Sequence, residues 1–310
     1  MDVVFCGTPQ FAVPTLEALA RQGFRVRLVV TQPDRPSGRG QELAAPPVKK
    51  SAQALGLPVT QPEKIKNNED FKAQLTQLAP RAIIVVGYGR IIPKWMIDLP
   101  PLGNLNLHAS LLPKYRGAAP IQWAIAAGET VTGNTTMRID EGLDTGDILL
   151  QQEMPIAPDD TTVTLAPRLA EAGARLMVQT LRGLESGSIR PRPQDQAKAS
   201  LAPILRKEDG LIDLQRPAAE LLNRLRGFQP WPGAYSTFRG KSLLIHAARI
   251  PQETGVPPST FLVQHDRLLV GAGGGSVLEI LELQLEGKKR MAVRDFIHGY
   301  QPKAGERLGS

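Results

Sequence analysis

The sequence predicts an α/β protein of two domains, in which a mostly parallel sheet with helices on both faces precedes a smaller domain of short strands. In the first half of the chain, apolar runs alternate with helical segments, which is typical of a parallel sheet. In the second half, several short strands are separated by turn residues. The length of 310 residues also fits two domains at roughly 100–200 residues each.

The first half contains the elements of the predicted parallel sheet. We expect strands at 3–6, 26–31, 82–86, 104–108, 133–139 and 147–153, and helices at 11–21, 48–55, 71–78, 119–127 and 165–184. The stretch 32–47 is rich in Pro, Gly and Arg, has no periodicity and is predicted to be a loop. Pro167 fits the last helix only if it falls in the first turn, where its missing N–H is not needed.

A polar segment without apolar pattern separates the two halves. We therefore divide the chain into a domain at 1–189, a linker at 190–205 and a domain at 206–310. In the last of these we expect helices at 218–226 and 293–298, and strands at 235–238, 242–250, 259–265, 268–270 and 276–285. Such short, closely spaced strands indicate a small β-barrel or an open sheet.

Composition excludes several classes of protein. The single cysteine, Cys6, rules out an internal disulfide framework and a clustered cysteine zinc site, and it fits a reducing compartment. It is expected to be a small buried side chain rather than a nucleophile. No apolar run approaches the roughly 18 residues of a membrane helix. Strand character begins at Val3, so no signal peptide is expected. His246, His265 and His298 lack partners at metal-ligand spacing, so no metal is expected.

The positive charge is concentrated in the second half. Residues 1–189 carry 19 basic and 18 acidic side chains, whereas residues 190–310 carry 18 and 12. The net charges are therefore +1 and +6, out of +7 for the chain. This asymmetry favours either a binding surface for a polyanion such as nucleic acid or a solvated basic face.

The N-terminal strand ends in a turn that suits a nucleotide fold but not a dinucleotide cofactor. Gly7-Thr8-Pro9 follows the first strand, yet there is no G-x-G-x-x-G pattern. The second strand ends at Thr31 without the acidic residue that binds a ribose. The sequence therefore favours the fold class without a nicotinamide cofactor.

Polar residues in the strand 104–108 point to a site. Alternation places Asn106 and His108 on one face of this strand, where buried side chains of both types need hydrogen-bond partners. Such groups at the carboxyl end of a strand face the ligand crevice of an open α/β sheet, although a structural Asn–His pair is the alternative. Asp144 lies in an acidic turn at 140–147 and could orient His108 or transfer a proton with it. A calcium loop is excluded because Gln151 occupies the twelfth position.

These residues belong to longer motifs that resemble a known family. N-x-H at 106–108, S-L-L-P-K-Y-R-G-A-A-P-I-Q-W-A at 110–124 and G-x-D-T-G-D-I at 142–148 resemble the 10-formyltetrahydrofolate-dependent formyltransferase family. The branch of that family that formylates methionyl-tRNA is similar at further motifs: G-T-P-x-F-A at 7–12, Q-P-D-R-P-x-G-R-G at 32–40, V-V-x-Y-G-x-I-x-P at 85–93, R-G-F-Q-P-W-P-G-A at 226–234 and G-K-K-R-M at 287–291. The resemblance covers essentially the whole chain.

The resemblance implies a fold and a reaction. It implies a Rossmann-like catalytic domain at 1–189 and an OB-like, tRNA-binding β-barrel at 206–310. The formyl group of 10-formyltetrahydrofolate would pass to the α-amino group of methionyl initiator tRNA, for use in translation initiation. It further implies a cytoplasmic enzyme, expected to be a monomer, without a metal, a membrane or an obligate protein partner.

The family's catalytic residues match Asn106, His108 and Asp144. The carboxamide and the imidazole would donate to the oxyanion that develops in the reaction. The carboxylate would favour a protonated His108 and relay a proton from the attacking amine through water.

The resemblance also implies binding residues. The folate-contacting positions match Ser110, Leu111, Leu112, Pro113, Tyr88 and Gly89. A plain turn explains residues 110–113 equally well, while Gly89 allows close approach of a ligand to the backbone. The expected tRNA contacts are Arg35 and Arg39 in the loop, and Arg206, Lys207, Arg224, Arg226, Lys288, Lys289 and Arg290 in the basic half. The composition of the loop alone fits a mobile exposed segment.

Two departures and two alternatives accompany the resemblance. Ile204 and Leu214 stand where the family usually has Lys and Trp, which makes contacts in this segment harder to assign. The first alternative is an enzyme that formylates a small molecule such as an amino sugar, or that hydrolyses formyl-folate. The second is an RNA-binding module without catalysis. The intact Asn106, His108 and Asp144 set argues against the second, and the basic second domain argues against the first.

Overall fold

The computed structural model describes residues 1–37 and 42–309 and divides into two compact units. Unit 1 consists of Met1–Pro120, Val131–Pro155 and Ala166–Pro203, and unit 2 of Ile121–Thr130, Ile156–Leu165 and Ile204–Ser310. Residues 121–130 and 156–165, which were expected in the domain at 1–189, thus belong to unit 2. Most of the linker expected at 190–205 belongs to unit 1.

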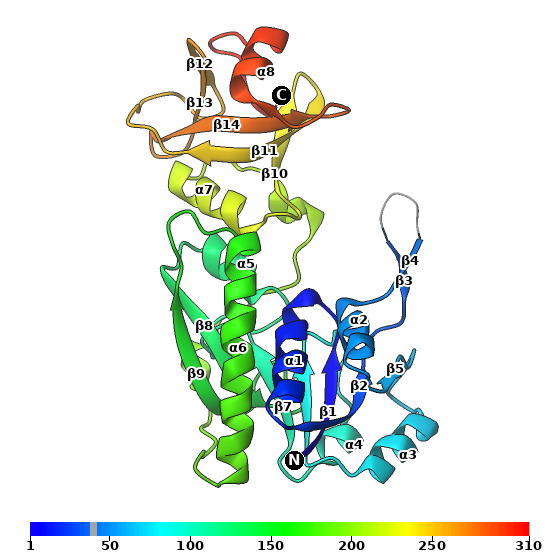
Figure 1. Cartoon of the computed structure of the whole chain (residues 1–310). Coiled ribbons are helices and arrows are strands. Elements are labelled where there is room, and N and C mark those ends of the chain that lie inside the picture. Colours follow the sequence, from blue (N-terminus) through cyan, green and yellow to red (C-terminus); the bar gives the residue numbers. More distant parts are fainter. Residues whose placement is uncertain (38–41, 310) are drawn as a thin grey trace. The chain divides into compact units, whose positions relative to one another are not determined.

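Unit 1 is built on a seven-stranded sheet (Figure 1). Its order is β5-β2-β1-β6-β7-β8-β9, and the first five strands are parallel while β8 and β9 are antiparallel. The bounds are Asp2–Gly7 for β1, Arg25–Val30 for β2, Val59–Thr60 for β5, Ala82–Val86 for β6, Asn104–His108 for β7, Val131–Arg138 for β8 and Ile148–Pro155 for β9. The predicted mostly parallel, Rossmann-like sheet is therefore confirmed.

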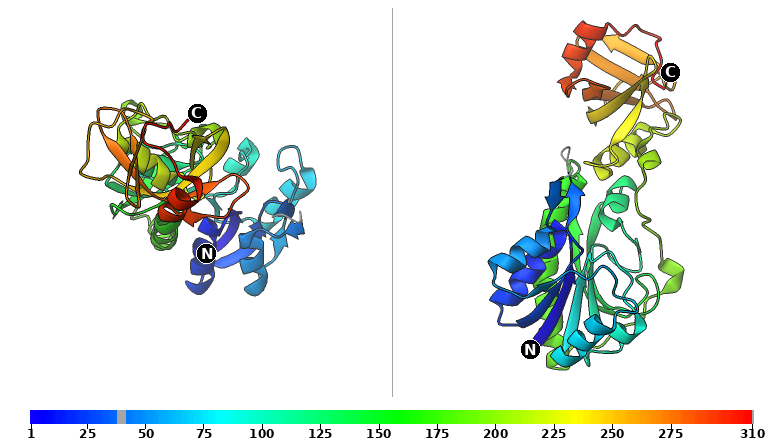
Figure 2. Two further views of the ribbon diagram at one scale, coloured as in Figure 1. Left: turned by 90° about the horizontal axis from the view of Figure 1, so that it is seen from above. Right: turned by 90° about the vertical axis from the view of Figure 1, so that its right-hand side faces the viewer.

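Helices cover both faces of this sheet (Figure 2, right). One face packs against α1 (Val13–Arg21), α2 (Pro47–Ala54) and α6 (Thr162–Glu185), and the other against α3 (Glu69–Leu78) and α4 (Lys94–Ile97). Successive residues of β1 enter opposite cores, which explains why its sequence is apolar throughout. Cys6 is fully buried there, and burial raises the pKa of its thiol.

The register aligns the carboxyl ends of the central strands. Gly7 of β1 pairs with Val86 of β6, and Val85 pairs with Asn106 of β7. From β1 the chain continues to β2 on one side of the sheet, whereas from β6 it continues to β7 on the other side. A crevice is expected at such a change of direction, where β1 and β6 end. The residues that follow these strands are therefore neighbours although they are far apart in sequence.

Two expectations for unit 1 were wrong. The predicted loop at 32–47 contains an antiparallel pair, β3 (Arg35–Ser37) and β4 (Glu42–Ala44). Arg35, Pro36, Leu43 and Ala44 of this pair are exposed, so no apolar period indicates the pair in the sequence. Pro167 lies in the second turn of α6 rather than the first, because the helix begins at Thr162. Val163, whose carbonyl loses its helical donor to this proline, is exposed and open to water.

Unit 2 contains an antiparallel sheet, which confirms the predicted domain of short strands. Its strand path is β10-β11-β14-β13-β12, and β15 pairs with β14. The bounds are Ala234–Phe238 for β10, Lys241–Arg249 for β11, Phe261–Gln264 for β12, Arg267–Gly271 for β13, Val277–Leu285 for β14 and Met291–Ala292 for β15. Its helices are α5 (Pro120–Ala126), which belongs to unit 2 from Ile121 on, α7 (Ala218–Gly227) and α8 (Val293–Tyr300), and it has a 3₁₀ turn at Lys207–Gly210. The 3₁₀ turns at Gln10–Ala12 and Gln196–Lys198 belong to unit 1.

Aromatic side chains organise the core of unit 2. Phe238 packs against Phe261 and Phe296, with ring centroids 5.7 and 5.2 Å away. Leu214, the residue that replaces the usual Trp of the resembled family, is buried in the same core. That departure is thus a change of core packing.

Unit 2 also buries one carboxylate between two arginines. Glu279 on β14 is 3% exposed and accepts hydrogen bonds from Arg267 and Arg249. These bonds, chiefly that from Arg267, lower the pKa of Glu279 from 4.5 to about 2. Because the folded-state pKa is the lower one, the pair stabilises the fold above pH 4.5, and this contribution is lost as the pH falls toward 2.

We expect Glu279→Gln to destabilise unit 2 at pH 7 by about 2 kcal/mol, since the arginines are partly solvated. The variant should also lose part of the acid sensitivity between pH 4.5 and 2. Urea unfolding at pH 7 and pH 3 measures both effects. Glu282→Gln is the control, because the Glu282–Arg290 pair is exposed and contributes little. Equal pH dependence of the wild type and Glu279→Gln would contradict this account.

Candidate active site

Three polar side chains meet at the carboxyl end of β7. Asn106 and His108 share one face of this strand, and Asp144 comes from the turn between β8 and β9. Asn106 Nδ2 lies 3.4 Å from Asp144 Oδ1, and His108 Nδ1 lies 3.7 Å from Asp144 Oδ2. The structure therefore brings together the three residues expected to be catalytic.

The orientation of His108 is set by a backbone carbonyl. Its Nε2 atom lies 2.8 Å from the carbonyl oxygen of Tyr115, and the side chain is nearly buried. Because a carbonyl oxygen only accepts, we assign the hydrogen to Nε2. The other ring nitrogen, Nδ1, then faces the Asp144 carboxylate and is the one that can gain or lose a proton there.

Asp144 itself adopts an unusual backbone conformation. Its φ is +52°, in the left-handed region that Asp tolerates better than most residues. The glycines on either side of it in the turn, Gly142 and Gly146, do not have a positive φ. These glycines instead permit close contacts: a Cβ on Gly146 would lie 2.0 Å from the carbonyl oxygen of Arg138.

A second backbone contact holds the Asp144 carboxylate. Its Oδ2 atom accepts a hydrogen bond of 2.8 Å from the N–H of Gly117. Gly117 has a φ of +120°, and a Cβ there would lie 2.6 Å from the carbonyl oxygen of Ala202. Glycine is therefore required at position 117 both by its conformation and by the neighbouring chain.

The arrangement combines a carboxamide donor, an imidazole and a carboxylate at one edge of the sheet. A carboxamide N–H can stabilise a developing oxyanion, and an imidazole beside a carboxylate can transfer a proton. Asn106 and Asp144 are partly exposed, so a substrate can reach them. The geometry thus suits transfer of an acyl or formyl group.

A cavity of about 670 Å³ opens at the ends of the neighbouring strands β1, β2 and β6. It is lined by Thr8, Pro9, Gln32, Pro33, Arg35, Pro36, the segment 44–47 and the segment 87–90. Three buried polar side-chain atoms of its lining residues have no partner among the described residues: Gln32 Oε1, Arg90 Nε and the hydroxyl of Tyr88, whose side chain packs in the core. An unpaired acceptor and an unpaired donor fit a ligand with a polar edge.

The expected folate positions fall into two groups. Tyr88 and Gly89 line the cavity, but the Tyr88 side chain is buried in the core, so only its backbone can meet a ligand. Ser110 is fully buried and donates to the Lys114 carbonyl, and Leu112 packs against Met137 and Ile148. Ser110 and Leu112 thus shape the turn from inside, and a contact of either residue with the folate stays a prediction.

The two other residues of that turn are more accessible. Leu111 and Pro113 are half-buried, so a ligand can still touch them. Both lie at the turn that begins just after His108, within the same edge of the sheet.

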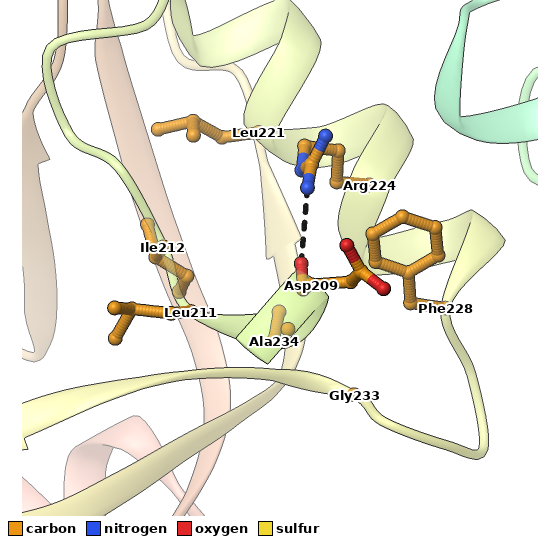
Figure 3. A pocket seen from close by; sticks show the side chains of 9 residues that line it. Asp209, Leu211, Ile212, Leu221, Arg224, Phe228, Gly233 and Ala234 are labelled. Carbon is orange, nitrogen blue, oxygen red and sulfur yellow. Dashed lines mark hydrogen bonds between the residues drawn. The ribbon is translucent and has the colours of Figure 1, made fainter. Parts of the chain in front are cut away.

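The residues expected to contact nucleic acid differ in their exposure and in whether their side chains already have partners. Arg35, Arg206, Lys207, Lys288 and Lys289 are exposed, Arg290 pairs with Glu282, and Arg39 lies outside the described residues. Two further arginines hold unit 2 together: Arg224 donates to the Asp209 carbonyl and stacks on Phe228 (Figure 3), and Arg226 donates to the Asp160 carbonyl. Arg224 and Arg226 therefore stabilise the fold of unit 2, and their contact with tRNA stays a prediction.

The sequence reasoning missed several residues at this edge. Gln32 and Arg90 line the cavity, while Arg116 and Gln194 are buried beside the Asp144 turn. Gln32, Arg90 and Arg116 lie within the quoted motifs, but nothing in their spacing indicated a role. Gln194 lies in the expected linker, where a polar residue normally indicates solvent exposure.

The part of the chain that the structure describes contains neither a metal-binding cluster nor a helix that could span a membrane. No group of His, Cys, Asp and Glu there could hold a metal ion. Nor is any helix in those residues long and apolar enough to cross a membrane.

Comparison with known proteins gives matches over both units. The Formyl transferase family matches residues 1–181, and Formyl transferase, C-terminal domain, matches residues 204–301. The methionyl-tRNA formyltransferase of Koribacter versatilis is 67% identical over 309 residues, which is 100% of this chain and 99% of that protein. The methionyl-tRNA formyltransferase of Acidobacterium capsulatum is 64% identical over 311 residues, which is 100% of both chains.

Solved structures share the fold at low identity. An N-formyltransferase from Helicobacter canadensis, in complex with folinic acid and dTDP-3-aminofucose, has a TM-score of 0.67 at 19% identity and covers 90% of this chain and 98% of that one. Glycinamide ribonucleotide transformylase 1 from Symbiobacterium toebii has a TM-score of 0.51 at 22% identity, and covers 63% of this chain and 94% of that one. Its lower coverage fits a protein that lacks a counterpart of the second domain.

Gly117 provides a test of how closely the site is packed. We expect Gly117→Ala to destabilise the protein by more than about 2 kcal/mol, because it adds a clash with the Ala202 carbonyl to the cost of a positive φ. The control, Gly56→Ala, has a positive φ with no atom within 4 Å, and should cost only about 1 kcal/mol. Urea unfolding compares the two. Equal losses would show that the contact between Gly117 and Ala202 is not tight.

Proposed function

The chain belongs to the methionyl-tRNA formyltransferases of the formyl transferase family, and we propose that it formylates the α-amino group of methionyl initiator tRNA. The formyl donor is 10-formyltetrahydrofolate and the product, N-formylmethionyl-tRNA, is used in translation initiation. The observation that carries the proposal is identity of 64–67% to methionyl-tRNA formyltransferases over the whole chain, both domains included. The cluster of Asn106, His108 and Asp144 provides the chemistry.

Each member of the cluster has a role that its contacts support. Asn106 donates its amide N–H to the oxygen of the formyl group as negative charge develops there. Asp144 accepts the proton that the attacking amine releases, directly or through water, because its carboxylate is held at the open edge of the sheet. His108, anchored through Nε2, takes this proton from Asp144 at Nδ1 and passes it on to the leaving nitrogen.

The folate is a substrate, and the residues present fit it. When bound, it supplies the formyl group and leaves as tetrahydrofolate with a proton on N10. The cavity beside the cluster is lined by the backbone of Tyr88 and Gly89, and the unpaired Arg90 Nε and Gln32 Oε1 suit a polar ring edge. Leu111 and Pro113, in the turn that follows His108, provide half-buried apolar surface.

In this proposal the second domain binds the tRNA backbone. Arg206, Lys207, Lys288 and Lys289 are exposed, and no ion pair within the described residues neutralises their positive charge, which suits phosphate binding. Arg35 and Arg39, in the segment that includes β3 and β4, are proposed to meet the acceptor end. All three residues proposed to be catalytic come from one chain, so a monomer suffices for the reaction. Because the product is used in translation, we propose that the reaction takes place in the cytoplasm.

Formyl transfer from labelled 10-formyltetrahydrofolate tests the substrate. We expect transfer to methionyl initiator tRNA and none to deacylated tRNA or to an amino sugar nucleotide. Transfer to the sugar but not to the aminoacylated tRNA would overturn the proposal in favour of a small-molecule formyltransferase. Release of formate without an acceptor would indicate a hydrolase instead.

We expect Asn106→Ala and Asp144→Ala each to lower the single-turnover rate of transfer by about 10²-fold or more, because each removes a positioned donor or proton acceptor. The KM for tRNA should change little. Leu143→Ala is a control on the same turn, because this side chain is exposed. A near-normal rate in either catalytic variant would refute its assigned role.

The basic surface has its own test in the salt dependence of binding. Replacing both Lys288 and Lys289 by Ala should weaken tRNA binding and reduce the slope of log Kd against log salt by about 1 to 2, since each phosphate contact releases counterions. Lys66→Ala with Lys72→Ala removes the same charge from exposed positions in unit 1 and should leave the slope unchanged. An equal effect of both double variants would mean that net charge, not this surface, determines binding.

A further inference from the structure

The segment expected to be a linker packs against the active site. Residues 194–202, here called the strap, run beside residues 113–119, here called the site loop. The N–H of Arg116 donates to the Ser200 carbonyl at 2.8 Å, and the N–H of Ala202 donates to the Arg116 carbonyl at 2.7 Å. The N–H of Ala119 donates in turn to Ala202 at 3.2 Å. The strap therefore fixes the loop whose backbone contacts the catalytic residues.

The site loop is the part of unit 1 that holds His108 and Asp144 in place. Its Tyr115 carbonyl accepts the hydrogen bond from His108, and its Gly117 N–H binds the Asp144 carboxylate. The strap contacts the same stretch, since Ser200 Oγ accepts a hydrogen bond of 2.9 Å from the N–H of Tyr115. Movement of the strap would thus move the partners of both catalytic groups.

One strap side chain also binds the turn that carries Asp144. The Gln194 Nε2 group donates to the carbonyl of Asp144 at 2.8 Å and to that of Gly146 at 2.7 Å. Its Oε1 accepts two hydrogen bonds, of 3.0 and 2.6 Å, from the guanidinium of Arg116. Gln194 and Arg116 are buried, at 7% and 6% exposed, so these bonds are made away from solvent.

Gln194 therefore connects the turn that carries Asp144 to the site loop, whose Gly117 N–H binds the Asp144 carboxylate. Asp144 has a positive φ and needs such support, because its own conformation is not the one the chain prefers. The carboxylate meets Gly117, and Gln194 ties Asp144 to Arg116, the residue next to Gly117. Both ends of the contact are thus fixed by one side chain.

We propose that Gln194, anchored by Arg116, is a positioning residue that holds the Asp144 carboxylate in its catalytic place. The inference rests on the proposed function, in which Asp144 accepts a proton. Gln194 touches no reacting atom and acts only through the Asp144 turn. Because a displacement of about 1 Å in a catalytic group can cost about 10²-fold in rate, loss of this support should be visible in kcat.

Gln194→Glu is the sharpest variant. It keeps the size of the side chain and an oxygen for Arg116, but it replaces the N–H donor with an oxygen that faces the carbonyls of Asp144 and Gly146. We expect kcat to fall about 10- to 100-fold, while the KM values for folate and tRNA stay within about 2-fold. The matched control is Gln196→Ala, which removes another partner of Arg116 without a contact to the Asp144 turn, and its kcat should stay within about 2-fold.

A double-mutant cycle separates positioning from general damage. If Gln194 acts through Asp144, Gln194→Glu should cost less than about 2-fold when added to Asp144→Ala, measured in single turnover. An equal loss in both backgrounds, an equal loss in Gln196→Ala or a normal kcat in Gln194→Glu would each overturn the inference. If Gln194→Glu fails to fold by its urea midpoint, Arg116→Lys takes its place and should show the same non-additivity. A wild-type enzyme without formyl transfer would instead overturn the proposed function itself.

Discussion

The hydrogen bond between the Asp144 carboxylate and the Gly117 N–H is the contact on which the site depends. It joins two stretches of chain that lie 27 residues apart, and it sets the carboxylate beside Asn106 and His108. The contact requires a left-handed conformation at Asp144 and a glycine at position 117. Conformations of this kind persist only where the surroundings hold them, and here the surroundings are the sheet edge on one side and the strap, residues 194–202, on the other.

The sheet provides the first of these supports. Parallel pairing of β1, β6 and β7 brings the ends of three strands to one edge, so that the cavity and the residues proposed to be catalytic are neighbours. The strap provides the second, through buried Gln194 and Arg116. A side chain that does not itself touch the substrate can therefore influence the rate, because catalysis by a positioned carboxylate depends on where its oxygens lie.

Local patterns predicted much of the fold, but not the contacts that complete the site. The bounds expected for β6 and β7 agree with the structure because both strands are bordered by turn residues, and alternation placed Asn106 and His108 on one face. Gln194 could not be found in this way, since it binds backbone carbonyls 50 and 48 residues away, which leave no pattern in the sequence. The β3–β4 pair and the second-turn position of Pro167 were missed because neither depends on an apolar period.

The central claim is that the Asp144 carboxylate accepts a proton during formyl transfer. Asp144→Asn tests it most directly, because asparagine keeps the size of the side chain and an oxygen for the Gly117 N–H but loses the negative charge. The measurement is the single-turnover rate of formyl transfer to methionyl initiator tRNA, with folding checked by urea unfolding. We expect the rate to fall by about 10²-fold or more with an unchanged unfolding midpoint. A rate close to that of the wild type would contradict the claim.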